Sequence, residues 1–373
     1  MGKYDNLILS IPQEYHKWGV FAIPRGSFRG TTVMPDAKVY MGLAAVTKAH
    51  LMEVAHMHHA VDEYIVFASA DLESFRDGFD AEIEIWLGED PERLELFSIT
   101  EPTIIRIPPK LYHCPINFKR IGKPVFFSAM YLDGDWSKII RNINADGQEE
   151  FSYDGAGIRR CVKDSSKLCV YCGECFSKRM KESEKTDANK ASQKDEMLAS
   201  YYEMSQQPRT GNYDKYVYKF KPEFHDDKRF SNPRYGFRGL CEMAESRLWY
   251  THNLIKGECA IGEPHMHHAI EEYLFFTGPN LAEFSVFDAE IEILIGDHPD
   301  RMESYLITEP SVVRIPAKLW HSPITVKRVG TPVNFMPFYP NGSYGRVIRS
   351  NNPDGTFTYT SKGEDLPDNS AAK

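Results

Sequence analysis

Two nearly identical stretches of the chain combine residues that could hold a metal ion. HMHHAVDEY occupies residues 56–64, and HMHHAIEEY occupies residues 265–273. Histidines two apart on a strand point to the same side, so His56 and His58 can converge, with an acid joining them across a bend. Converging imidazole and carboxylate groups are what a transition metal requires.

A later histidine offers one more donor in each copy. It ends the stretches RIPPKLYH and RIPAKLWH, so that a strand some fifty residues further along would complete the site. The predicted metal ligands are His56, His58, Glu63 and His113 in the first copy, and His265, His267, Glu272 and His321 in the second.

The choice of acid is open, because Asp62 and Glu271 directly precede the preferred carboxylates. Strand alternation does not decide between neighbours through a turn. We favour Glu63 and Glu272 because the two copies share that residue type.

The chain contains one module written twice. The stretch FDAEIEIWLGEDPERLE at 79–95 returns as FDAEIEILIGDHPDRME at 287–303. The repeat runs from about residue 4 to 155 and again from about 213 to 363. A period this long indicates a duplicated domain and not a solenoid repeat. Within each copy, short runs such as EYIVFA, AEIEIWL and TIIRIP are rich in β-branched and aromatic residues and are bounded by turn formers, which predicts an all-β sandwich or barrel.

The combined motif H-x-H-x4-E followed by P-x4-H resembles the two metal-binding motifs of the cupin superfamily, and its duplication resembles a bicupin. The resemblance implies two tandem cupin-type jelly-roll β-barrels, each holding one metal through three histidines and one glutamate. Lys110 and Lys318 depart from the family pattern, which usually has glycine at that position of the second motif.

The predicted domains follow from the repeat. They are an N-terminal cupin barrel at 1–155, a linker at 156–212, a C-terminal cupin barrel at 213–363 and a disordered tail at 364–373. The linker is charged and poor in core-forming residues, which is typical of a solvated and partly helical segment.

The linker also contains four of the seven cysteines, spaced C-x7-C-x2-C-x2-C: Cys161, Cys169, Cys172 and Cys175. Thiolates at such intervals can hold a zinc ion or an iron–sulfur cluster, and the alternative is a set of free reduced thiols.

Two further pairs of acids recur at i and i+2 of a strand, namely Glu82, Glu84, Glu290 and Glu292. Each pair shares one face of its strand. On the interior face they could act as general acid or base beside a metal, and this is their predicted catalytic role. On the outer face they would be solvated or paired with Lys and Arg.

Composition limits the classes of function. A net charge of −9 with 42% hydrophobic and 26% charged residues describes a soluble globular protein. The chain offers no basic stripe for nucleic acid and no apolar run long enough to span a bilayer, so we expect a cytoplasmic protein with a small-molecule partner. A homo-oligomer is compatible with these features.

The resemblance implies a metal-dependent bicupin enzyme acting on a small polar or carboxylate-bearing substrate. The expected chemistry is dioxygenase-like, as an oxidoreductase with iron, or decarboxylase-like, as a lyase with manganese. A divalent Fe, Mn or Zn ion is expected in each barrel, two per chain. The alternative is a non-catalytic protein that binds or senses a small molecule through its metal.

The cysteine cluster should be separable from the barrels. Changing Cys172 to Ser should lower the zinc or iron–sulfur content and leave both histidine-rich sites loaded, because structural sites of this kind are usually closed by four donors. Metal analysis and a thermal melt of the variant measure this. Unfolding of the whole chain would show instead that the linker is integrated with the barrels.

Overall fold

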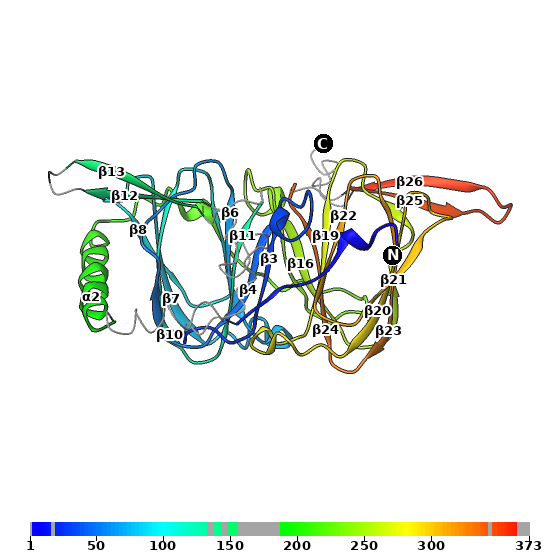
Figure 1. Cartoon of the computed structure of the whole chain (residues 1–373), viewed down its shortest axis with the longest axis horizontal. Helices are drawn as coiled ribbons and strands as arrows, with labels where there is room; N and C mark the ends of the chain where they lie inside the picture. Colours follow the sequence, from blue (N-terminus) through cyan, green and yellow to red (C-terminus); the bar gives the residue numbers. More distant parts are fainter. Residues whose placement is uncertain are drawn as a thin grey trace, which may run out of the picture. The chain divides into compact units, whose positions relative to one another are not determined.

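The computed structural model describes residues 2–15, 19–132, 137–143, 146, 148–155, 187–341 and 345–363. Strands dominate this part of the chain, and its one long helix is α2 (Asp187–Met204). The predicted all-β class is confirmed (Figure 1). Among the described residues, no helix has both the length and the apolar character needed to cross a bilayer.

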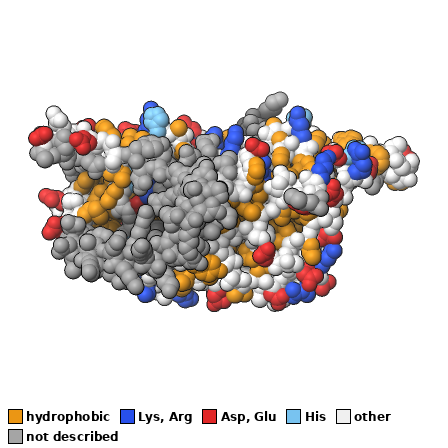
Figure 2. Space-filling model, viewed as in Figure 1, with side chains coloured by type: hydrophobic (Ala, Val, Ile, Leu, Met, Phe, Trp, Pro, Cys, Tyr) orange, Lys and Arg blue, Asp and Glu red, His pale blue; other side chains and the backbone are white. Residues whose placement is uncertain are grey.

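The chain divides into two compact units. The N-terminal unit comprises Pro12–Lys219, and the C-terminal unit comprises Met1–Ile11 together with Phe220–Lys373. On the described surface of the C-terminal unit, Figure 2 shows acidic and basic side chains interspersed, so that face presents no field of a single sign.

The N-terminal unit is built of two main antiparallel sheets and a hairpin. The larger sheet has the order β14 (Val217–Lys219), β9 (Thr103–Ile107), β6 (Glu63–Ser69), β11 (Val125–Tyr131), β4 (Tyr40–Val46), β3 (Arg25–Arg29) and β2 (Gln13–Glu14). The smaller sheet has the order β5 (His50–Met52), β10 (Tyr112–Ile121), β7 (Ala81–Gly88) and β8 (Glu95–Ile99). The hairpin pairs β12 (Ser137–Ile143) with β13 (Glu149–Gly155). Alternate residues of β7, among them Ile83 and Ile85, enter the core with Ile65 and Phe67 of β6.

The C-terminal unit repeats this plan. Its first sheet has the order β1 (Ile8–Ser10), β22 (Ser311–Ile315), β19 (Glu272–Thr277), β24 (Val333–Tyr339), β16 (Trp249–Ile255) and β15 (Tyr235–Arg238). Its second sheet has the order β21 (Glu303–Ile307), β20 (Ala289–Gly296), β23 (Trp320–Val329), β18 (His265–Met266), β25 (Gly345–Asn351) and β26 (Phe357–Gly363), with β17 (Cys259–Ile261) also paired to β23. Leu274, Ile291, Ile293 and Val313 are among the residues of the core.

The first strand of each sequence repeat lies in the unit formed by the other repeat. In β1, Leu9 pairs with Val312 of β22. In β14, Tyr218 pairs with Ile104 of β9. The residues before β1 also join the C-terminal core, in which Tyr4 and Leu7 are buried. The compact units therefore differ from the sequence repeats at their first strands, while the predicted boundaries at 155, 212 and 363 stay predictions.

Helix α2 lies within the predicted linker and packs on the outer face of β7. The Trp86 ring lies 5.7 Å from Tyr201 and 5.6 Å from Tyr202 between ring centroids. The indole Nε1 of Trp86 donates a hydrogen bond of 2.7 Å to Ser205. This part of the linker is thus anchored to the N-terminal unit by aromatic contacts, in place of the solvated character expected from its charge.

Deleting residues 2–10 should selectively destabilise the C-terminal unit. The deletion removes strand β1 and the buried side chains of Tyr4 and Leu7, and burial of one such side chain contributes about 2 kcal/mol or more to the free energy of unfolding. Hydrogen exchange should accelerate at the amides of β22. The amides of β9, whose edge is covered by β14, are the internal control, and faster exchange there instead would contradict the strand assignment.

Candidate metal centres

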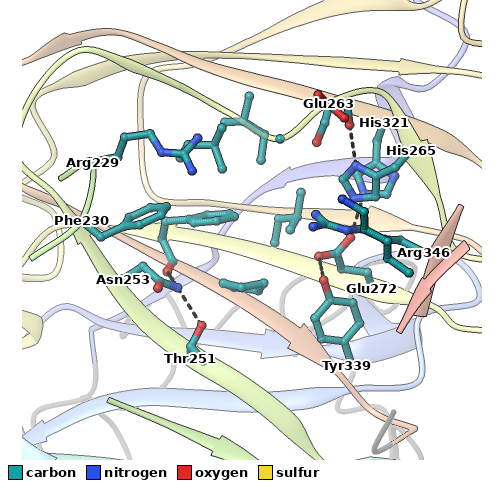
Figure 3. A pocket seen from close by; sticks show the side chains of 18 of the residues that line it. Arg229, Phe230, Thr251, Asn253, Glu263, His265, Glu272, His321, Tyr339 and Arg346 are labelled. Carbon is teal, nitrogen blue, oxygen red and sulfur yellow. Dashed lines mark hydrogen bonds and ion pairs between the residues drawn. The ribbon is translucent and has the colours of Figure 1, made fainter. Parts of the chain in front are cut away.

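The four predicted donors of the second repeat meet in the C-terminal unit, and three of them, His265, Glu272 and His321, line a cavity there (Figure 3). The ligand atoms of His265, His267, Glu272 and His321 all lie within 4.8 Å of one another, and all four residues are buried. Glu272 Oε2 is 3.1 Å from His267 Nε2 and 3.0 Å from His321 Nε2. Backbone pairing of β18 with β23 sets His265 opposite His321.

Backbone carbonyl groups fix the orientation of these imidazoles. Each Nδ1 atom lies against a carbonyl oxygen, at 2.7 Å for His265 and Glu263, 2.7 Å for His267 and Gly345, and 3.2 Å for His321 and Leu319. A carbonyl oxygen only accepts, so Nδ1 carries the hydrogen and Nε2 is turned toward the centre of the cluster. This is the arrangement that prepares a histidine to ligate a metal through Nε2.

The charges of the cluster suit a cation. Burial, and then the neighbouring His321, lower the pKa of His265 to about 2, so its imidazole is neutral. Burial alone would raise the pKa of Glu272, but the hydrogen bond and charge of His267 and those of His321 lower it well below its ordinary value. Burial alone would lower the pKa of His267, but the hydrogen bond and charge of the Glu272 carboxylate outweigh this effect and raise it. A buried carboxylate held ionised beside imidazole nitrogen atoms attracts a cation, and the residues present fit a divalent metal.

The first repeat brings the equivalent residues together in a second buried cluster. Glu63 Oε2 is 3.0 Å from His58 Nε2 and 2.9 Å from His113 Nε2. His56 is paired through its backbone with His113, and their ring centroids are 4.2 Å apart. The donors form two overlapping groups that share His113, namely His58 with Glu63, and His56 with Cys114.

The pKa values of this first cluster shift in the same directions as those of His265 and Glu272. Burial lowers the pKa of His56 well below its ordinary value, and the imidazole Nδ1 lies 2.7 Å from the Val54 carbonyl oxygen. Burial opposes ionisation of Glu63, but the charges and hydrogen bonds of His113 and His58 lower its pKa well below the ordinary range. A neutral imidazole and an anionic carboxylate are thus again buried in one cluster.

One tyrosine in each unit supports the glutamate, and sequence reasoning missed both. The Tyr339 hydroxyl donates to Glu272 Oε1, the carboxylate oxygen that does not face the imidazoles. Tyr131 forms the matching hydrogen bond to Glu63. The two tyrosines are separated by the same interval as the other residues in the second half of each repeat, and that recurrence was the available signal.

Two lysines close the turn before the last histidine. Lys110 has φ 70° and Lys318 has φ 68°, a region that favours glycine. Their backbone N–H groups donate to the carbonyl oxygens of His58 at 2.7 Å and His267 at 2.6 Å. The left-handed turn that the cupin motif usually gives to glycine is therefore retained with lysine, and it ties the two halves of each motif together.

The prediction of four catalytic carboxylates is corrected by their placement. Ile83, Ile85, Ile291 and Ile293 fill the cores, so the alternate residues of β7 and β20 point outward. All four acids contact cations there, at 3.0 Å for Glu82 and Arg120, 3.2 Å for Glu84 and Lys119, 3.1 Å for Glu290 and Arg328, and 3.0 Å for Glu292 and Lys327. Cys161, Cys169, Cys172 and Cys175 lie outside the described residues.

The two cavities differ in size and in charge. The C-terminal cavity has a volume of about 490 Å³ and is lined by cations that include Arg346 and Lys362. The N-terminal cavity has about 140 Å³, and its Lys138 forms an ion pair of 2.5 Å with Glu53. The residue equivalent to Lys138 is Arg346, and the residue equivalent to Glu53 is Gly262.

Comparison with known proteins identifies the fold. No protein-family model and no curated protein matches the chain. Solved structures of oxalate decarboxylase OxdC from Bacillus subtilis are similar to it over 93% of its length. A point mutant of that enzyme matches with 12% identity, a TM-score of 0.52 and 80% of its chain covered. The same enzyme at pH 4.6 matches with 12% identity, a TM-score of 0.51 and 79% covered. The chain therefore shares the fold of oxalate decarboxylase, as the predicted pair of tandem β domains requires.

Each histidine cluster should bind one metal ion per chain. Replacing His58 with Ala should remove about one equivalent, and replacing His267 with Ala should remove the other, because each change deletes a donor from only one cluster. Metal content of the purified variants, measured by elemental analysis, tests this. The exposed His59 and His268 are matched controls, and an unchanged content in both cluster variants would show that the ligand assignment is wrong.

Proposed function

We propose that this chain is a metal-dependent bicupin enzyme that decarboxylates a small carboxylate-bearing substrate, mainly in its C-terminal unit. The observation that carries the proposal is the C-terminal cavity, which joins a buried set of three histidines and one glutamate to a cationic wall. The fold shared with oxalate decarboxylase supports this class of reaction.

Arg346 is the residue that we assign to the substrate carboxylate. Its side chain lies beside His265 and Glu272 in Figure 3, and its charge opposes protonation of His267. A guanidinium can hold a carboxylate through two parallel hydrogen bonds, which fixes both the position and the orientation of the acid. A substrate held in this way would present its carboxylate to the four donors.

The N-terminal cavity is less suited to an acid. Glu53 already neutralises Lys138, and an incoming carboxylate would compete with it for the ammonium group. Gly262 stands at the equivalent position of the C-terminal cavity, which has the larger volume of about 490 Å³. The smaller volume of about 140 Å³ also lies below the range of about 300–1,000 Å³ that is usual for ligand sites.

A bound divalent ion would supply Lewis-acid polarisation of the substrate carboxylate. The chain supplies the rest of the site. Tyr339 holds the second oxygen of Glu272 and thereby fixes the carboxylate plane. Leu274, Ile324 and Phe335 form an apolar wall of the cavity, and excluding water there strengthens the attraction between Arg346 and an anionic substrate.

Replacing Arg346 with Gln should lower kcat/KM about ten- to hundredfold, mainly through KM, and leave the metal content unchanged. The reason is the loss of a charged hydrogen bond, which contributes about 1.5–3 kcal/mol. The assay is release of CO₂ from small di- and keto acids by protein reconstituted with manganese. The matched control is Lys138→Gln, which we expect to have a small effect on turnover.

The outcomes of this assay separate the alternatives. A larger loss in Lys138→Gln than in Arg346→Gln would assign the reaction to the N-terminal unit. Oxygen uptake by iron-loaded protein without CO₂ release would indicate a dioxygenase. Saturable binding of the acids with no product would leave the protein as a metal-dependent binding or sensing module.

A further inference from the structure

The N-terminal cluster contains a donor type that the C-terminal cluster lacks. Cys114 is a free cysteine, 2% exposed, and its Sγ lies within 4.8 Å of ligand nitrogen atoms of His56 and His113. It also lines the N-terminal cavity. The equivalent residue of the second repeat is Ser322, which lines the C-terminal cavity. At this position the two copies therefore differ in a single atom type, sulfur in place of oxygen.

A β-bulge makes this contact feasible. Consecutive residues of a regular strand point to opposite faces, so His113 and Cys114 should not share a cavity. The pairing of β10 with β7 shifts register between His113 and Ile116, and Cys114 has φ 75°. Bulges of this kind re-aim a side chain, and here two successive residues reach the same site. Ser322 keeps the same conformation, with φ 72°.

A left-handed backbone at a residue other than glycine is uncommon, and such conformations concentrate at functional sites. Both units retain a left-handed residue directly after the last histidine. This conformation directs the Cys114 sulfur or the Ser322 oxygen inward. In the N-terminal unit that atom is a potential metal ligand. Thiolate sulfur prefers zinc, iron and other borderline or soft ions, whereas a site of imidazole and carboxylate accepts manganese.

We propose that Cys114 ligates the N-terminal metal together with His56 and His113, and that this unit selects zinc or iron while the C-terminal unit takes manganese. The inference rests on the proposed metal binding and adds the identity of the ion. On binding, the thiol proton leaves to solvent, the thiolate forms the metal–sulfur bond, and no atom changes oxidation state. The N-terminal centre would then serve a role distinct from the manganese chemistry proposed for the C-terminal unit.

Cobalt titration of the full-length metal-free protein tests the proposal. Bound cobalt gives a thiolate-to-metal charge-transfer band in the near ultraviolet only if sulfur is a ligand. The titration is made in a background in which Cys161, Cys169, Cys172 and Cys175 are Ser, so that the linker contributes no thiolate. We expect the band in this background, its loss in Cys114→Ser, and a second band of the same type on introducing Ser322→Cys.

Competition between zinc and manganese gives a second readout. Cys114→Ser should lower the preference of the N-terminal centre for zinc at least about tenfold, since even the partners of metal ligands change affinity by that factor. Ser322→Cys should raise the zinc preference of the C-terminal centre in the same sense. The His113→Ala and His321→Ala variants assign each metal to its unit, because His113 belongs to both N-terminal donor groups.

The outcomes test the thiolate ligand and metal binding separately. Two bound metals with no sulfur band, or a band unchanged in Cys114→Ser, would overturn the thiolate ligand and leave the metal proposal standing. No metal at either histidine cluster would overturn both. If near-ultraviolet circular dichroism shows that Cys114→Ser is misfolded, the Ser322→Cys variant decides, and failure of a folded Ser322→Cys protein to gain the band contradicts the proposal.

Discussion

Each unit is organised around one buried carboxylate that faces two imidazoles. Glu63 and Glu272 are 2% exposed, and an ion taken out of water at such a position costs several kcal/mol unless its surroundings compensate. The compensation comes from two histidines at about 3 Å on one oxygen and a tyrosine hydroxyl on the same carboxylate. A cation between these donors would offset that cost further.

The rest of each unit holds these groups in place. In each unit the ligands come from three separate segments of the chain, so no local segment could form the site alone. Backbone pairing sets His56 opposite His113 and His265 opposite His321, and the turn at Lys110 or Lys318 ties the two motifs together. The Nδ1 contacts use carbonyl groups near strand ends, which have acceptor capacity free for a side chain. The site therefore depends on the sheets being complete, including the edge strand that each unit takes from the other repeat.

The sequence predicted the fold class, the duplication and the meeting of the histidines with Glu63 and Glu272, because motif spacing and repetition carry that information. It did not predict which face of its strand Glu84 occupies. Alternation divides the residues of a strand between two faces, but only the packing of the partner sheet decides which face lies in the core. The exchange of first strands was also hidden, because equivalent segments of a repeat can pair with equivalent edges. The difference between Cys114 and Ser322 beside the last histidine was visible in the sequence, but a ligand role for Cys114 was not predicted, because alternation places it outward and only the bulge turns it in.

Duplication allows the two sites to diverge while the scaffold stays the same. The retained residues are those that set geometry: the histidines, the glutamate, the supporting tyrosine and the left-handed turns. The replaced residues are those that set the charge of the cavity and the softness of its potential ligand atoms. They are Glu53 and Cys114 in one cavity and Gly262 and Ser322 in the other. Each of these changes acts on which ion or acid the cavity accepts and leaves the strands that build it unaltered. In a chain with two such centres, one can bind the substrate while the other binds a different metal ion. Substitutions in one cavity do not disturb the backbone that positions the ligands of the other.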